Sequence, residues 1–176
     1  ELEMKEWQRA LPDYQILCPR PQMLLIARGQ IRNVQLTPIG RHSDVATADI
    51  EQDGTVLNIA LVDIISNLHY GRAEPLQNLS RVLNERPTRP HVVMGDFNTP
   101  PESVWFKSLR QEYQCAFDHN GRGLRPTWPV PAPVLQLDYL WTRNDVTVHQ
   151  CFHGWTTASD HRPVIAQVTI ATTATE

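Results

Sequence analysis

Hydrophobic positions in the first third of the chain predict one short helix followed by strands. Apolar residues recur at helical spacing before Pro12, which ends the run (Met4, Trp7, Leu11). The segment 23–27 (MLLIA) is a short apolar run that predicts a buried strand, and 31–36 predicts a second. A β-hairpin follows, with strands over 45–51 and 56–65 joined by the turn Asp53-Gly54.

The rest of the chain alternates helical and strand patterns. An apolar stripe from Pro75 to about Glu85 predicts a helix, and 92–94 predicts a buried strand that ends at Gly95-Asp96. Thr99-Pro100-Pro101-Glu102 is typical of a capping box and predicts a helix through Tyr113. Residues 118–134 look like a loop, and three strands are expected over 135–141, 146–152 and 164–170. This order, without repeats or a linker, indicates one layered α/β domain over residues 1–176.

Composition narrows the class of protein. With 41% hydrophobic and 20% charged residues, the 176-residue chain is expected to fold. Its net charge of −3 weighs against coating long nucleic acid by bulk charge, although a local basic rim stays open. No apolar run approaches the roughly 20 residues of a membrane span. The chain starts at Glu1 rather than at Met, so an N-terminal truncation is expected, an upstream anchor is conceivable and the compartment is left open.

The three cysteines, Cys18, Cys115 and Cys151, are few, odd in number and widely spaced. This pattern favours neither a disulfide framework nor a zinc cluster. We expect all three to be small buried apolar residues. No stable protein partner is evident from the sequence.

Polar residues interrupt the predicted strands at three places. Asp96 and Asn98 lie two apart at a strand end, and strand alternation would turn both side chains to one face. A carboxylate there can bind a hard cation or take a proton from water, and a carboxamide can donate to a phosphoryl oxygen. A simple turn is the alternative, because Asp and Asn are common at strand ends.

The other two places are Asp160-His161, just before an apolar strand, and Asp138, within an apolar segment. An imidazole trades protons near neutral pH, and the adjacent Asp160 could join a metal shell or orient another group. A buried carboxylate such as Asp138 must be satisfied or lie at a functional edge. The structural alternatives are a loop pair for Asp160-His161 and an arginine partner for Asp138.

Taken together, Gly95-Asp96-Phe97-Asn98, Leu137-Asp138-Tyr139 and Ser159-Asp160-His161 resemble the signature of the endonuclease/exonuclease/phosphatase superfamily. The segment 24–31 and Thr127-Trp128-Pro129 add to the likeness, which covers most of the chain. The resemblance implies a four-layer α/β sandwich of two packed, mostly antiparallel sheets flanked by helices.

The resemblance also implies roles for the site residues. Asp96 would help to activate water, Asn98 would position the phosphate or its leaving oxygen, and His161 would contact the phosphoryl group. Asp138 would support His161, and Asp160 would belong to the metal shell. A Mg²⁺ or Mn²⁺ ion would act as the Lewis acid.

The sequence departs from the family pattern at two points. The family's first strand, with its Asn, is absent, and Glu1 (or Glu3) stands roughly where the family has a metal-binding Glu. Asp63 replaces the usual His in Leu61-Val62-Asp63, where it could bind a second cation or cap the strand. His69 is a possible substitute for that histidine.

One further segment has candidate binding residues. Arg122 and Arg125 lie with His119 in a Gly/Pro-rich loop near Trp128, where they could hold a phosphate and stack a base. A solvated loop with a packed Trp is an equal reading.

From these features we expect a metal-dependent phosphoester hydrolase, with an endonuclease or phosphodiesterase as the leading interpretation. The predicted metal ligands are Glu1, Asp96 and Asp160, and the predicted catalytic residues are Asp96, Asn98, His161, Asp138 and Asp63. The expected partner is a phosphoester, with nucleic acid among the candidates. A lipid or inositol phosphate hydrolase and a non-catalytic binding domain are the alternatives.

Overall fold

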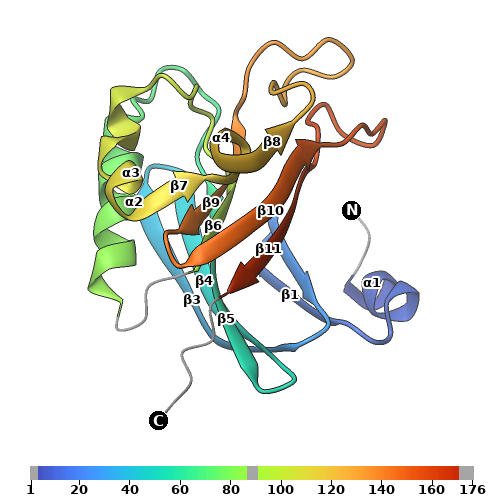
Figure 1. Ribbon diagram of the computed structural model, residues 1–176. Helices are drawn as coiled ribbons and strands as arrows, with labels where there is room; N and C mark the ends of the chain where they lie inside the picture. The colour runs from blue at the N-terminus through green and yellow to red at the C-terminus, as the bar shows by residue number, and fades with distance from the viewer. Residues whose placement is uncertain (1–3, 87–90, 171–176) are drawn as a thin grey trace.

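A six-stranded sheet forms the centre of the computed structural model, which describes residues 4–86 and 91–170 (Figure 1). Its strand order is β3-β4-β5-β6-β9-β7. The strands are β3 (Gln30–Gly40), β4 (Ser43–Gln52), β5 (Thr55–Asp63), β6 (Val92–Asp96), β9 (Asp138–Arg143) and β7 (Tyr113–Cys115). Strands β5 and β6 run parallel, whereas the other neighbours are antiparallel.

The predicted hairpin is confirmed as β4 and β5. Asp53 and Gly54 both have positive φ, 50° and 76°, which is the conformation that a two-residue turn of type I′ requires. The turn sets the register of the two strands and pairs Asp44 with Asp63 at their far end.

Helices cover one face of this sheet. Helix α2 (Ala73–Glu85) contains the predicted apolar stripe and buries Leu76, Leu79 and Leu83. The 3-10 helix η1 (Val104–Lys107) and helix α3 (Leu109–Glu112) lie on the same side in Figure 1. Their shared core contains an aromatic cluster of four side chains: Phe97, Phe106, Tyr139 and Trp141.

Two smaller sheets cover the other face. One is the hairpin of β1 (Gln15–Arg20) and β2 (Met23–Ala27), and the other has the order β11-β10-β8. The latter contains β8 (Gly121–Arg122), β10 (Val146–His153) and β11 (Val164–Ile170). Leu17 and Leu25 of the hairpin pack on the large sheet beside Ile59 and Met94.

The outer helices complete the layers. Helix α1 (Met4–Ala10) contacts β1, and helix α4 (Ala116–Asn120) packs against β10. The predicted α/β sandwich is therefore confirmed. Its second β-layer consists of two separate pieces in the described residues. No helix in that part of the chain is both long and apolar enough to cross a membrane.

Two predictions about local structure are wrong, and one strand was missed. No helix begins at Pro100, because the Thr99 hydroxyl donates to the Phe97 carbonyl (2.7 Å), and Ser103 caps the short η1 instead. Strand β1 went unpredicted because its burial pattern has no clear alternation. Cys18 is exposed on this outer strand, whereas Cys115 and Cys151 are buried as expected.

Candidate active site

Four aspartates form a row across four neighbouring strands of the large sheet. Asp44 of β4 pairs with Asp63 of β5, Asp63 with Asp96 of β6, and Asp96 with Asp138 of β9. Each lies within one residue of a strand end, so all four carboxylates are at the same edge of the sheet. Such a row concentrates negative charge unless cations or protons neutralise it.

Asp96 is held by Asn98. The backbone N–H of Asn98 donates to Oδ1 of Asp96 and its side-chain amide donates to Oδ2, both at 2.8 Å. The same amide also donates to the Ile64 carbonyl at 2.7 Å. Because these two bonds use both amide hydrogens, Asn98 is engaged in holding the carboxylate and the exit of β5.

The two side chains meet by a different route from the one predicted. Strand β6 ends at Asp96, and Asn98 has a φ of 44°, so a left-handed turn brings them together rather than strand alternation. Asn tolerates this conformation better than most residues. The two interpretations of this motif, a simple turn and a functional pair, are therefore compatible with the same geometry.

Gly95 allows β5 and β6 to approach closely at this point. Its φ is 140°, and a Cβ atom there would lie 2.0 Å from the Val62 carbonyl oxygen. The Ile64 N–H in turn donates to the Asp96 carbonyl at 3.0 Å. Glycine is therefore required for the approach that places Asp96 beside Asp63.

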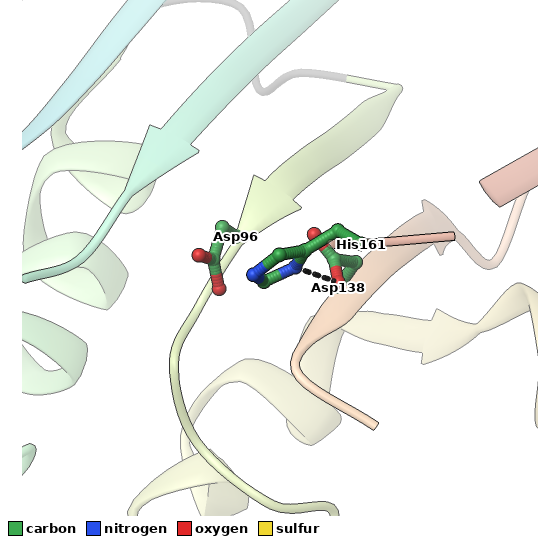
Figure 2. Close-up of side chains that lie close together, drawn as sticks. All are labelled: Asp96, Asp138 and His161. Carbon is green, nitrogen blue, oxygen red and sulfur yellow. Dashed lines mark hydrogen bonds and ion pairs between the residues drawn. The ribbon is translucent and has the colours of Figure 1, made fainter. Parts of the chain in front are cut away.

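Asp138 and His161 form a second pair, which faces Asp96. Nδ1 of His161 lies 2.8 Å from Oδ2 of Asp138. Figure 2 shows the imidazole ring between the two carboxylates, with its other nitrogen turned toward Asp96. Three segments far apart in the sequence therefore converge on one point.

Thr127 fixes the position of this pair. Its buried hydroxyl accepts from the N–H groups of Leu137 (3.0 Å) and Asp138 (3.2 Å), while its carbonyl accepts from the Arg162 N–H (2.8 Å). One residue thereby ties the start of β9 to the segment that contains His161. Buried hydrogen bonds of this kind are costly to lose.

Arg162 anchors the same segment from within the protein. It is 3% exposed, and its guanidinium donates to the carbonyls of Gly154 (2.9 Å), Leu124 and Pro126 (both 2.8 Å), and also to that of His153. Burial lowers the pKa of this guanidinium. Sequence reasoning missed the role of Arg162, whose only signal was its place between His161 and Pro163.

The charges at this site fit a cation. One ligand atom from each of Asp96, Asp138 and His161 can be chosen so that all lie within 4.8 Å of one another. Burial, and then the charge of Asp138, raises the pKa of Asp96 to about 6. A divalent cation would relieve this unfavourable charge, and carboxylate oxygens are suitable ligands for one.

His161 is electrostatically tuned by its neighbours. Burial alone would lower the pKa of its imidazole, but the hydrogen bond that it donates to Asp138 and the charges of Asp138, Asp96 and Asp160 outweigh burial. The pKa of His161 is therefore raised above its ordinary value. The protonated ring is favoured beside the carboxylates.

The predicted metal ligands other than Asp96 have different surroundings. Asp160 lines the same cleft but is exposed, and its Oδ2 accepts from Nε1 of Trp128 at 3.1 Å, outside the three-residue cluster. Glu1 lies outside the described residues. In the part of the chain that the structure describes, the group that could hold a metal ion consists of Asp96, Asp138 and His161.

Asp63 is paired with an arginine. Its Oδ2 accepts from Nη2 of Arg20 at 2.6 Å, and Nη1 of Arg20 donates to Asp44. Burial raises the pKa of Asp63, and the Arg20 charge opposes that rise. Arg20 lies on the unpredicted strand β1, so the sequence offered no signal for this contact.

Other candidate residues lie away from the cleft. His69 is exposed and bonds to Asn67, and it does not line the cleft. Neither Arg122 nor His119 lines it, and Arg125 forms an ion pair with Asp118. Of the predicted aromatic and basic loop, only Trp128 reaches the site.

The row of aspartates opens into a cleft of about 1460 Å³. Arg72, another residue missed by sequence reasoning, lines it and donates to four backbone carbonyls: Asn98 (2.8 Å), Tyr70 (2.7 Å), Ser66 (3.1 Å) and Asn67 (3.3 Å). It thereby ties the loop after β5 to the turn at Asn98. Burial lowers the pKa of Arg72, and the charge of Asp96 opposes this.

Comparison with known proteins adds independent findings. A model described as the Endonuclease/Exonuclease/phosphatase family matches residues 19–161. A search of curated proteins found no match.

Solved structures share the fold at low sequence identity. The human Nocturnin catalytic domain with bound sulfate anion is 17% identical, with a TM-score of 0.72 over 96% of this chain and 77% of that one. D. rerio TDP2 complexed with single strand DNA product is 13% identical, with a TM-score of 0.71 over 96% and 83%. A functionally unknown conserved protein from Enterococcus faecalis V583 is 18% identical, with a TM-score of 0.62 over 73% of this chain. This chain spans 56% of that protein's length.

Proposed function

The chain belongs to the endonuclease/exonuclease/phosphatase family, and we propose that it is a metal-dependent phosphoester hydrolase. The observation that carries the proposal is the convergence of Asp96, Asp138 and His161 within 4.8 Å at the end of an open cleft. In this proposal the whole chain acts as one catalytic domain. The family's chemistry is phosphoester hydrolysis, and the residues present fit it.

Asp96 is proposed to accept the proton of the attacking water. Its carboxylate lies at the cleft within the three-residue group, and a carboxylate can take a proton from water. Asn98 is proposed to hold Asp96 in position, because both of its amide hydrogens are already used. This differs from the phosphate-binding role that the family resemblance implied for Asn98.

His161 is proposed to face the phosphoryl group through the nitrogen that does not contact Asp138. Its raised pKa favours the protonated ring, which can stabilise negative charge on the phosphoryl oxygens or return a proton to the leaving oxygen. Asp138 would orient the ring. Asp96 and Asp138 would hold a Mg²⁺ or Mn²⁺ ion through their carboxylate oxygens, and the ion when bound supplies Lewis-acid charge at the phosphoryl oxygens.

The test is His161→Ala on bis-p-nitrophenyl phosphate, supercoiled plasmid and a phosphomonoester, in the presence of Mg²⁺ or Mn²⁺. Loss of one positioned transition-state contact is expected to slow hydrolysis by roughly 10²–10³-fold. His69→Ala is the matched control, because this exposed histidine lies outside the cleft lining. Circular dichroism checks that both variants fold.

Two outcomes would count against the proposal. A folded His161→Ala variant that matches the wild-type rate would remove the reaction centre from this cluster. Wild-type protein that hydrolyses none of the three substrates with either metal would favour the alternative, a non-catalytic binding domain that keeps the fold.

A further inference from the structure

Exposed apolar side chains line the cleft that contains the carboxylate cluster. Leu24 of β2 is 38% exposed, Leu68 in the loop after β5 is 91% exposed, and Leu135 before β9 is 41% exposed. All three line the same cleft as Asp96 and His161. Exposed leucines that line one cavity indicate a binding site, whereas single leucines scattered over a protein surface need no explanation.

The arginines in the cleft are already engaged. The guanidinium of Arg20 donates to Asp44, Asp63 and the side chain of Gln22. The guanidinium of Arg72 donates to four backbone carbonyls. A phosphate that bound to either arginine would first have to displace these contacts.

The charge of the cleft is also unfavourable for a polyanion. The charged side chains among the described residues that line it are four aspartates, two arginines and the protonated His161: Asp44, Asp63, Asp96, Asp160, Arg20, Arg72 and His161. Nucleic acid binding depends on cations that neutralise successive phosphates. A metal at the cluster could serve the scissile phosphate, but the phosphates on either side would face aspartates and leucines.

We propose that the substrate has a single phosphate esterified to an alcohol that carries an alkyl or acyl chain, with the phosphate at Asp96 and His161 and the chain along Leu24, Leu68 and Leu135. The inference rests on the proposed hydrolase function. Water forms a new O–P bond and gives its proton to Asp96, while the P–O bond to the leaving alcohol breaks and that oxygen takes up a proton. The apolar wall binds the part of the substrate that carries no charge.

The experiment compares four soluble chromogenic phosphodiesters: methyl, butyl and octyl p-nitrophenyl phosphate, and the p-nitrophenyl ester of thymidine 5′-phosphate. We expect kcat/KM to rise with chain length by at least about 100-fold from methyl to octyl, because each buried methylene strengthens binding. The nucleotide ester is expected to be slower than the octyl ester. A chain-length profile that is flat, or a preference for the nucleotide ester, overturns the inference while leaving the hydrolase proposal intact.

Two variants test the wall itself. Leu68→Ser and Leu135→Ser are expected to reduce the octyl-to-methyl ratio by roughly 10-fold, since a polar side chain then meets the alkyl chain. Leu124→Ser is the matched control, because Leu124 is 50% exposed but lies outside the cleft lining. An equal ratio in all four proteins would overturn the assignment. Because Leu68 is almost fully exposed, its substitution leaves the fold intact.

A binding measurement separates the two proposals. Octylphosphonate and methylphosphonate are added to wild type and Leu68→Ser, and the melting temperature is recorded in Mn²⁺. A larger shift with octylphosphonate in wild type alone supports the apolar subsite even if no ester is hydrolysed, in which case only the hydrolase proposal fails. Equal shifts with both phosphonates overturn the subsite.

The source of the chain is resolved with vesicles of phosphatidylcholine, a phosphodiester like the chromogenic substrates. Release of choline or phosphocholine from these vesicles, reduced in Leu68→Ser, indicates a membrane lipid. Hydrolysis of the soluble octyl ester without release of choline or phosphocholine from vesicles indicates a soluble alkyl phosphoester. Failure of the octyl ester and of the vesicles, when methyl p-nitrophenyl phosphate is hydrolysed, overturns the inference.

Discussion

Asp63 and Asp96 occupy paired positions on neighbouring strands, yet their surroundings differ sharply. Asp63 shares the Arg20 guanidinium with Asp44, so this half of the aspartate row contains its own cation. Asp96 receives two hydrogen bonds from Asn98 and faces Asp138, and among the described residues no arginine or lysine pairs with it directly.

The difference shows how one row of like side chains can serve two purposes. In the Asp44–Asp63 half, a fixed arginine neutralises charge and ties β1 to β4 and β5. In the Asp96–Asp138 half, the positive charge of His161 offsets part of the negative charge of the two carboxylates, and a metal ion could bind at this group. The surroundings of each carboxylate, rather than its residue type, decide its chemistry.

The largest expected effect separates the two halves by activity. Asp96→Asn removes the proposed base and a metal ligand and is expected to lower kcat/KM by 10²–10⁴-fold, the usual range for general acid–base catalysis. Asp63→Asn is expected to lower it by less than about tenfold, because Arg20 already occupies that carboxylate. Calorimetric titration with Mn²⁺ should show binding to Asp63→Asn and none to Asp96→Asn. Equal losses of activity in both variants would contradict the division.

The second prediction concerns stability in the Arg20 half. Arg20→Met leaves two half-buried aspartates facing each other and is expected to cost about 1–3 kcal/mol of unfolding free energy. Arg32→Met is the control: its ion pair with Glu51 has side chains 58% and 43% exposed, against 17%, 18% and 25% for Arg20, Asp44 and Asp63. The exposed pair should contribute less than about 1 kcal/mol. Urea unfolding measures both, and similar losses would show that Arg20 is dispensable.

The third prediction is a pH dependence of the metal-free protein. A carboxyl group whose folded pKa is raised binds its proton more tightly when folded, so its stabilising contribution is lost as pH rises from about 4 through about 6. For Asp96 the loss should be on the order of 3 kcal/mol. Thermal melts in EDTA should show this decline in wild type but not in Asp96→Asn. A Mn²⁺-induced gain in stability that is no larger at pH 7 than at pH 5 would contradict the assignment.

Much of the fold was predictable because its signals are local. The hairpin of β4 and β5 follows from strand alternation on either side of Asp53-Gly54, and α2 follows from its apolar stripe. The predicted helix after Thr99 failed because tertiary contacts override a capping motif: Tyr139 donates to the Thr99 carbonyl (2.7 Å) and holds this segment in a turn.

The candidate site was predictable residue by residue but not as a constellation. The motifs containing Asp96, Asp138 and His161 were recognisable in the sequence, and the structure brings these three together. Asp160, expected in the metal shell, accepts a hydrogen bond from Trp128 and lies outside the three-residue group. That choice depends on the path of the loop after Thr127, which no spacing in the sequence specifies.

The sequence by itself determined the α/β class, the family, and the three motifs that supply the carboxylates and the imidazole. These depend on local periodicity and on residue types, which a chain displays before it folds. Only the tertiary structure decided that four aspartates stand in one row, that Arg20 neutralises one half, and that Asn98 holds Asp96. These contacts join residues up to 43 positions apart through strand register and loop path, and hydrogen bonds and charges over a few ångströms then set the chemistry of each group.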